Sequence, residues 1–134
     1  MGFLIDTCVW IDVERGTIAP ADVAAITADA PVFLSPVTLA ELKFGADAAP
    51  DAATRQKRLA ALRRIQRKPL LVIDGNTADI FGSLAAELKA GGRGHRYRVQ
   101  DLWLASQAIQ HGYSLLTRNE KDFRDIPGLD LVVM

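Results

Sequence analysis

The fold is decided by the stretch Phe3-Leu4-Ile5-Asp6-Thr7. Its three apolar residues are followed at once by two polar ones, which is typical of a buried strand that leaves its sheet at the polar pair. A helical pattern then continues over residues 7–16. We therefore expect a strand followed directly by a helix, which is the repeating unit of parallel α/β sheets.

The same alternation continues along the chain. Ser35 and Pro36 predict the start of a helix, because serine accepts a free amide hydrogen and proline has none to leave unpaired. Further strands are expected at residues 32–34, 70–73, 113–117 and 129–133. Further helices are expected from Pro20 onward and at residues 36–46, 49–68 and 99–111. Another helix, capped by Asp74 or Asn76, is expected to end at Gly91-Gly92, and residues 94–98 are loop-like. This order predicts an α/β fold whose central parallel sheet is flanked by helices on both faces.

Length and charge narrow the class of protein. The chain has 134 residues, 49% of them hydrophobic, with 16 basic and 16 acidic residues. We expect a single domain over residues 1–134. Zero net charge excludes a polybasic binder that acts by bulk charge, but not a nucleic-acid partner, because charge can be segregated along a chain. The single cysteine and the lack of a membrane-length apolar run predict a cytoplasmic protein without membrane association.

Two aspartates follow predicted strands. Asp6 comes directly after the strand at 3–5, and Asp122 lies a few residues after the strand at 113–117. In open parallel α/β sheets, ligands bind beyond the carboxyl ends of the strands. Both carboxylates are therefore expected at the edge of the sheet where a site would form.

Two further acids lie on helical faces that are otherwise apolar. Glu41 shares its stripe with Val37 and Phe44, and Asp101 shares its stripe with Leu104. An unpaired carboxylate among apolar neighbours is costly, so each needs a partner. The sequence leaves open which end of the sheet the first turn of the Asp101 helix occupies.

Together the four acids predict a metal centre. Clustered carboxylates repel one another unless cations neutralise them. Oxygen donors without a histidine or cysteine ligand set favour Mg²⁺ or Mn²⁺ over zinc. Such a centre suits phosphodiester hydrolysis, because the metal activates and aligns a water and offsets charge on the leaving oxygen. Taken singly, each acid also has a structural interpretation: a helix cap for Asp6, a surface or capping role for Asp122, and a buried ion pair with an arginine for Glu41 and Asp101.

Four segments also carry a family resemblance. They are residues 4–10 (LIDTCVW), 37–42 (VTLAEL), 101–108 (DLWLASQA) and 115–123 (LLTRNEKDF). In this order and spacing they resemble the PIN-domain ribonucleases, in particular the VapC-type toxins of bacterial toxin–antitoxin pairs. The resemblance covers nearly the whole chain.

The resemblance implies a Rossmann-like PIN domain that cleaves RNA with Mg²⁺ or Mn²⁺. It implies a homodimer held in check by a VapB-type antitoxin whose tail covers the active site. One departure is Cys8, where the family often carries asparagine; this puts one polar contact near Asp6 in doubt. The residues carried over as site residues are Asp6 and Asp101 as principal metal ligands, Glu41 and Asp122 as completing acids, and Thr7, Thr117 and Asn119 as orienting polar residues.

Basic residues gather in two segments. Residues 51–68 hold seven basic residues against one acid, and residues 89–98 hold four against none. Basic flanks beside an acidic centre suit a phosphate backbone, although a charge-rich helix at 51–68 is equally well explained as a solvated face. The loop at 91–98 leads directly into Asp101, so we expect RNA contacts from Arg93, Arg96 and Arg98.

Two other functions remain to be separated from a nuclease toxin. A regulatory PIN module that binds RNA without turnover would bind independently of metal and leave cells unharmed. A phosphatase of the haloacid dehalogenase type requires a second aspartate two residues after the first, and this chain has Cys8 there. The sequence therefore favours a divalent-metal-dependent endoribonuclease.

Overall fold

The sheet is parallel throughout. In this computed structural model, which describes residues 1–96 and 98–134, the strands are β1 (Phe3–Ile5), β2 (Val32–Phe33), β3 (Ser114–Thr117) and β4 (Asp130–Val133). They lie in the order β2-β1-β3-β4, and every neighbouring pair is parallel. The predicted α/β class and central parallel sheet are confirmed.

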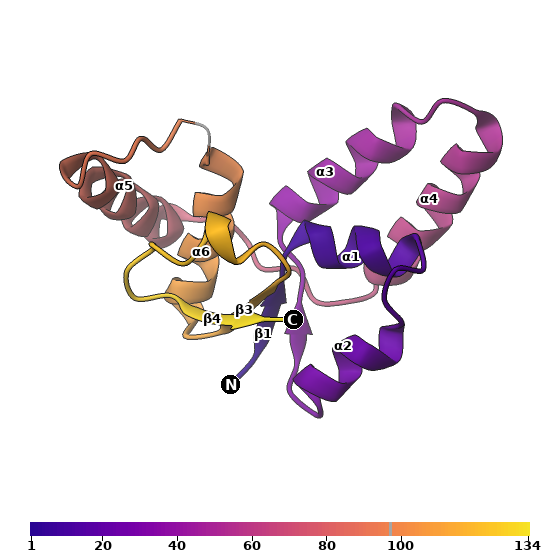
Figure 1. Cartoon of the computed structure of the whole chain (residues 1–134), viewed down its shortest axis with the longest axis horizontal. Helices are drawn as coiled ribbons and strands as arrows, with labels where there is room; N and C mark the ends of the chain where they lie inside the picture. Colours follow the sequence, from indigo (N-terminus) through magenta and orange to yellow (C-terminus); the bar gives the residue numbers. More distant parts are fainter. Residues whose placement is uncertain (97) are drawn as a thin grey trace.

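Helices cover the two faces of this sheet. They are α1 (Thr7–Glu14), α2 (Pro20–Thr27), α3 (Pro36–Asp47), α4 (Ala52–Ile65), α5 (Gly75–Ala90) and α6 (Val99–His111), followed by a 3₁₀ turn, η1 (Glu120–Asp122). Figure 1 shows α5 and α6 on one side of the sheet and α1 to α4 on the other, with α3 and α4 side by side as a hairpin. No helix in the described ranges has both the length and the apolar character needed to cross a bilayer.

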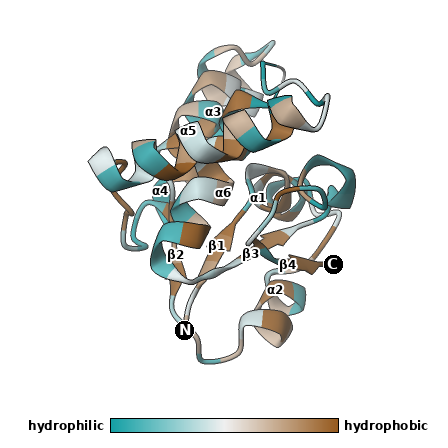
Figure 2. Ribbon diagram, turned by 90° about the vertical axis from the view of Figure 1, so that its left-hand side faces the viewer, coloured by the Kyte–Doolittle hydropathy of each residue, from teal (hydrophilic) through white to brown (hydrophobic). Residues whose placement is uncertain are grey.

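The alternation of side chains along the strands creates two cores. Leu4 and Leu115 are opposite one another and pack with α5 and α6, whereas Ile5 and Leu116 pack with α1 and α2. All four side chains are at most 1% exposed. Figure 2 shows β1 as hydrophobic along its length, as a strand buried on both faces requires. The short apolar run that opens the chain is therefore the centre of the molecule.

Local signals set the helix boundaries. The Ser35 hydroxyl accepts a hydrogen bond from the Val37 N–H at 3.1 Å, with Pro36 as the first helical residue of α3. At the end of α6, Gly112 adopts a left-handed conformation with φ of 68°, which residues with a side chain rarely adopt. Asp74 begins α5 through a reciprocal capping box with Thr77. Tyr97, within the predicted loop at 94–98, lies outside the described residues.

The expected strand at residues 70–73 is wrong. This segment makes only an isolated bridge between Leu34 and Leu70, and Val72 is 66% exposed. The carbonyl of Leu71 accepts instead from the Gln107 side chain of α6, at 2.8 Å. Beyond the hydrogen bond from the Leu71 N–H to the Leu34 carbonyl at 2.8 Å, the segment is held by a helix side chain, and α5 begins soon afterwards at Gly75.

The direction of α6 answers the question that the sequence left open. This helix precedes β3 and returns the chain to the start of that strand, so its first turn lies at the opposite end, beyond the carboxyl ends of the strands. Asp101 lies in that first turn. All four acids singled out in the sequence therefore belong to elements that meet at the same edge of the sheet.

Candidate active site

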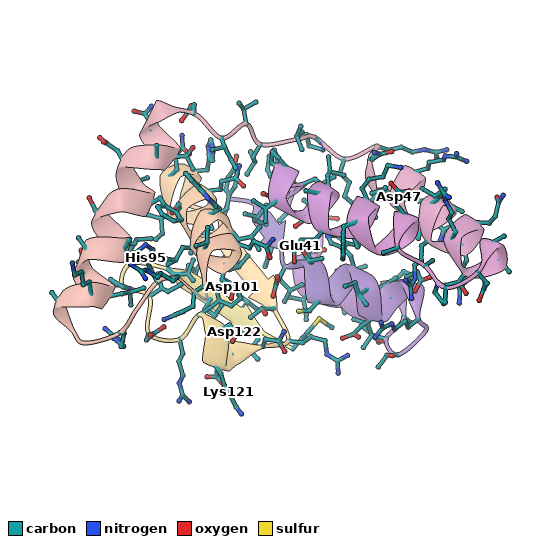
Figure 3. All side chains as sticks on the ribbon, turned by 90° about the horizontal axis from the view of Figure 1, so that it is seen from above. Glu41, Asp47, His95, Asp101, Lys121 and Asp122 are labelled. Carbon is teal, nitrogen blue, oxygen red and sulfur yellow. The ribbon has the colours of Figure 1, made fainter. Side chains whose placement is uncertain are left out.

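The four acids gather at the carboxyl edge of the sheet. Asp6 follows β1, Glu41 lies on α3, Asp101 begins α6, and Asp122 ends η1. Figure 3 shows the labelled Glu41, Asp101 and Asp122 in the middle of the molecule, between α6 on one side and α1 and α3 on the other. Segments that are up to 116 positions apart in the sequence thus bring their carboxylates to one place.

Asp6 is buried and held through one of its two carboxylate oxygens. Its side chain is 6% exposed. Its Oδ2 accepts hydrogen bonds from the Thr117 hydroxyl at 2.8 Å and from the Cys8 thiol at 3.1 Å. Asp6 occupies the N-cap position of α1, but its side chain accepts no capping hydrogen bond. The capping interpretation of Asp6 is therefore wrong, because its carboxylate turns toward β3 rather than toward its own helix.

Glu41 is anchored by hydroxyl groups rather than by a cation. The Thr7 hydroxyl donates to Glu41 Oε1 at 2.9 Å, and the Thr38 hydroxyl lies 3.1 Å from that of Thr7. Burial, and then the negative charge of Asp6, raise the pKa of Glu41, while the Thr7 hydrogen bond opposes the shift. Thr38 lies one turn before Glu41 on the same face of α3, and this spacing was the signal from which the sequence could have identified it.

Asp101 shows most clearly that the acids act on one another. Its pKa is raised to about 7, first by burial and then by the negative charges of Asp6, Asp122 and Glu41, with Arg98 opposing. Among the ion pairs of the described residues, none includes one of these four acids. The interpretation of Glu41 and Asp101 as partners of a buried arginine is therefore wrong.

Thr117 and Asn119 lie behind Asp6. Thr117 is fully buried, and its hydroxyl, which donates to Asp6, accepts from the backbone N–H of Asn119 at 3.0 Å. Asn119 thus contacts this network through its backbone, while the residue itself is exposed. Thr7 and Thr117 each donate a hydrogen bond to one of the acids.

Cys8 supplies a contact that the sequence put in doubt. Burial, and further the negative charge of Asp6, raise the pKa of the Cys8 thiol to about 11. The thiol therefore keeps its proton at neutral pH and donates it toward Asp6 Oδ2. A neutral sulfur donor takes the position where an asparagine often stands in the family that the sequence resembles.

The three loop arginines are not equivalent. Arg98 and Arg93 both contact the carboxylate of Asp125, whereas Arg96 is exposed. The Arg98 side chain is 18% exposed and that of Arg93 is 47% exposed. Arg98 is therefore engaged on protein acceptors in the structure, and the sequence contained no clear signal that Asp125 would be its partner.

A groove runs from the acids along α4. It has a volume of about 460 Å³ and includes Glu41 at its wall. Apolar side chains from α1, α3 and α4 and four basic residues line it; the basic residues are Arg15, Arg58, Arg64 and Lys68. Three of the seven basic residues in the segment 51–68 thus line this groove, and Glu41 connects the groove to the acidic edge.

The chemistry of the acids fits a hard divalent cation. In the described ranges no group of three His, Cys, Asp or Glu side chains is already arranged to hold an ion, so the acids stand as an open cluster. Asp101, half-buried and surrounded by three negative charges, keeps a proton up to about neutral pH. A cation that replaces this proton would relieve the repulsion, and the available donors are carboxylate oxygens, which Mg²⁺ and Mn²⁺ prefer.

Comparisons with known proteins agree with this geometry. A family model for the PIN domain matches residues 3–129. The ribonuclease VapC1 of Rickettsia felis is 31% identical over 139 aligned positions, which cover 100% of this chain and 97% of that protein. The ribonuclease VapC5 of Mycobacterium tuberculosis is 34% identical over 125 positions, which cover 93% and 87%.

A solved structure gives the same assignment. The chain is similar to one in the crystal structure of VapBC-5 from Mycobacterium tuberculosis, a member of the VapBC family of toxin–antitoxin systems, with a TM-score of 0.80 and 27% identity. The match covers 99% of this chain and 98% of that chain. With the family model and two relatives above 30% identity over nearly their full lengths, the chain belongs to the PIN-domain family, and within it to the VapC proteins.

Proposed function

We propose that this protein is a divalent-metal-dependent endoribonuclease that acts in the cytoplasm as the toxin of a toxin–antitoxin pair. The observation that carries the proposal is the raised pKa of Asp101, caused by burial and by three neighbouring carboxylates. Four acids held together, none of them in an ion pair within the described residues, are costly unless a bound metal offsets their repulsion. The similarity to proteins named ribonuclease VapC supports RNA as the substrate.

In the proposed reaction the four acids would bind the metal ion. Asp6 and Asp101 would hold Mg²⁺ or Mn²⁺, with Glu41 and Asp122 completing the pocket. A bound divalent ion supplies a Lewis acid that lowers the pKa of water and offsets charge on the leaving oxygen. Thr117 and Cys8 both donate to Asp6 Oδ2, which leaves Oδ1 without a protein hydrogen bond in the described residues.

Glu41 is suited to receive the proton of the attacking water. Its pKa is raised by burial and by Asp6, which moves its basicity toward the value that proton transfer at neutral pH requires. The Thr7 hydroxyl holds Oε1, so the carboxylate stays oriented while its other oxygen is available. The basic loop around Arg96 would contact the phosphate backbone of the RNA.

The decisive experiment compares purified wild-type protein with Asp6→Asn and Asp101→Asn on RNA in the presence of Mn²⁺ or Mg²⁺. Each variant keeps the shape of the side chain and loses its charge, so we expect cleavage to be lost in both. Asp79→Asn is the matched control, because it makes the same change at an exposed position on α5, away from the site. Full activity in both site variants would refute the assignment of the acids, and metal-independent RNA binding without turnover would favour a regulatory module.

An antitoxin of the VapB type is the proposed partner. Support comes from the VapBC complexes among the similar solved structures and from the groove that reaches Glu41. Its lining of apolar and basic side chains suits a tail with apolar anchors and acidic flanks. If a small reading frame beside the gene encodes such an antitoxin, its co-expression is expected to relieve growth arrest caused by the chain alone. We also expect a homodimer, measured by size-exclusion chromatography with light scattering. Growth arrest that persists beside a stably expressed neighbour would refute that partner.

A further inference from the structure

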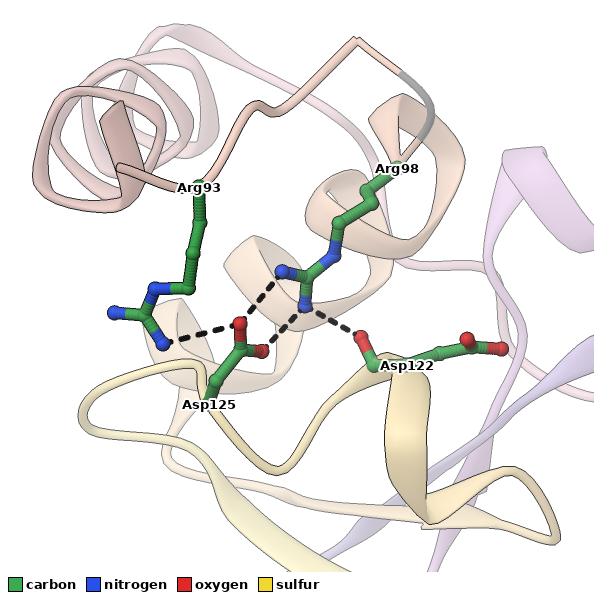
Figure 4. Close-up of polar contacts among 4 residues, drawn as sticks. All are labelled: Arg93, Arg98, Asp122 and Asp125. Carbon is green, nitrogen blue, oxygen red and sulfur yellow. Dashed lines mark hydrogen bonds and ion pairs between the residues drawn. The ribbon is translucent and has the colours of Figure 1, made fainter. Parts of the chain in front are cut away.

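Arg98 and Asp125 form a clasp that holds the backbone of Asp122 (Figure 4). The guanidinium of Arg98 donates to both carboxylate oxygens of Asp125, from Nη1 to Oδ2 at 2.8 Å and from Nη2 to Oδ1 at 2.6 Å. The same Nη2 donates to the main-chain carbonyl of Asp122 at 2.7 Å. The Arg98 side chain is thus fixed by a bidentate ion pair with Asp125 and at the same time binds the backbone of Asp122.

The clasp links the two segments that carry the last two acids. Arg98 lies three residues before Asp101, and Asp125 lies three residues after Asp122. The carbonyl that Arg98 holds is at the end of the 3₁₀ turn η1, where backbone oxygens lack partners within the turn and a cation is favourable. In Figure 4 the Asp122 carboxylate points away from the guanidinium, and its charge acts on Asp101.

Arg98 binds Asp125 through two hydrogen bonds, whereas Arg93 binds the same carboxylate through one. Arg93 reaches Asp125 Oδ2 at 3.1 Å through one hydrogen bond and is about half exposed. Arg98 makes the bidentate contact with a mostly buried side chain, and its hydrogen bonds lower the pKa of Asp125. A planar guanidinium can hold a carboxylate and a carbonyl at the same time, which a lysine ammonium cannot do with the same geometry.

We propose that Arg98 is a positioning residue: anchored on Asp125, it holds the Asp122 carbonyl so that the Asp122 carboxylate faces the other three acids. This rests on the proposed metal site, and it assigns Arg98 a role different from contact with RNA. The position of the fourth acid is then set by the backbone grip and not by contacts of the Asp122 side chain itself.

Removing Arg98 should change Mn²⁺ affinity in one direction if Arg98 positions Asp122, and in the opposite direction if it acts only through its positive charge. Arg98 carries a positive charge near Asp101 and Asp122. If charge were its whole contribution, its removal would make the site more negative and Mn²⁺ would bind more tightly. If Arg98 positions Asp122, its removal weakens Mn²⁺ binding despite the more negative site. The two roles predict opposite signs.

The test measures Mn²⁺ affinity by isothermal titration calorimetry in the full chain without RNA. Arg98→Ala is expected to weaken Mn²⁺ binding roughly tenfold, as loss of a residue that orients a metal ligand does. Arg98→Gln, neutral and of similar length, is expected to weaken it as well, and it serves if the alanine variant unfolds. Unchanged or tighter Mn²⁺ binding in folded Arg98→Ala and Arg98→Gln would overturn the proposal.

Two controls isolate the grip on Asp122. Arg93→Ala removes a charge from the same loop and the same carboxylate without a contact to Asp122, and Arg118→Ala removes another arginine–aspartate ion pair, with Asp12. Both are expected to leave Mn²⁺ affinity within about twofold of the wild type, as for partly exposed ion pairs. Equal weakening in Arg118→Ala would show that the effect belongs to ion-pair loss in general and would overturn the proposal.

A double-mutant cycle shows whether Arg98 acts through Asp122. In protein that already carries Asp122→Ala, the further change Arg98→Ala is expected to cause no additional weakening of Mn²⁺ binding, because the positioned carboxylate is gone. An equal further loss would overturn the proposal by placing the action of Arg98 elsewhere. Wild-type protein that binds no Mn²⁺ would instead refute the metal site itself, which distinguishes failure of the proposed function from failure of this inference.

Discussion

Aspartates begin helices in two regions of this molecule, with opposite consequences. At the starts of α4 and α5, Asp51 and Asp74 accept hydrogen bonds from the backbone N–H groups of Thr54 and Thr77, and these bonds lower their pKa values. At the carboxyl edge of the sheet, Asp6 caps nothing and Asp101 has its pKa raised by burial and neighbouring acids. The carboxylates that cap helices are stabilised and support the fold, whereas the raised pKa of Asp101 marks the site.

The largest effect is expected for Asp101→Asn, which should reduce catalysis and increase the stability of the metal-free protein. Asp101→Asn should reduce RNA cleavage on the order of a thousandfold, since a metal-centred site contributes several kcal/mol to the transition state. The same change should raise the melting temperature of the metal-free protein at pH 8, because it removes a half-buried charge that three acids repel. Cleavage assays measure the first effect and differential scanning calorimetry the second. A lower melting temperature in Asp101→Asn would contradict the conclusion that the ionised Asp101 side chain destabilises the folded protein.

The next effect is the dependence of metal affinity on pH. Asp101 has a pKa of about 7 because of burial first and then repulsion, so a metal ion must displace its proton below neutral pH. Mn²⁺ affinity should therefore rise by up to about tenfold per pH unit between pH 5.5 and 7, then level off. Calorimetric titration across this range measures the slope. An affinity that is flat with pH would mean that Asp101 is not a ligand.

The same shift predicts how stability changes with pH in the metal-free protein. Because the folded-state pKa of Asp101 is above its unfolded value, its protonation favours the folded state, and that contribution is lost as pH rises from about 4 through about 7. Wild-type protein should lose melting temperature over this range more steeply than Asp101→Asn. Parallel curves for the two proteins would contradict the shifted pKa.

The smallest effects are expected at the capping acids. Asp74→Ala should lower the melting temperature by a few degrees, because it removes the capping box of α5 and a contact with Gln110. Asp51→Ala should do less, because α4 is more exposed and Asp51 contacts only its own first turn. RNA cleavage below the melting temperature should be unchanged in both. If either variant lost cleavage without losing stability, the capping acids would not differ in role from the acids at the carboxyl edge of the sheet.

Much of the fold was predictable because its signals are local. The apolar runs that became β1, β2, β3 and β4, the Ser35–Pro36 helix start and the Gly112 helix end each depend on a few neighbouring residues. The segment 70–73 was misassigned because its pattern is that of a strand, while its pairing with Leu34 stops after one bridge and the Leu71 carbonyl accepts from the Gln107 side chain, 36 positions away. No local pattern contains that contact.

The site divides in the same way. The positions of Asp6, Glu41, Asp101 and Asp122 were predictable, since each is an acid placed after a strand or among apolar neighbours. The contacts that hold them were less predictable: the Cys8 thiol on Asp6, the Thr38 hydroxyl beside Thr7, and the hydrogen bond from Arg98 to the last residue of η1. Arg98 in particular reads from sequence as one of several basic loop residues.

The amino-acid sequence by itself determined the order of strands and helices, apart from the segment 70–73, and which four carboxylates are out of place among them. Periodicity and the chemistry of single residues act over a few positions, so they can be read along the chain. Only the tertiary structure decided that Asp101 lies at the same edge as Asp6 and that Arg98 faces Asp125 and Asp122. These relations depend on how α6 runs against the sheet, since Coulomb repulsion and hydrogen bonds depend on distance in space.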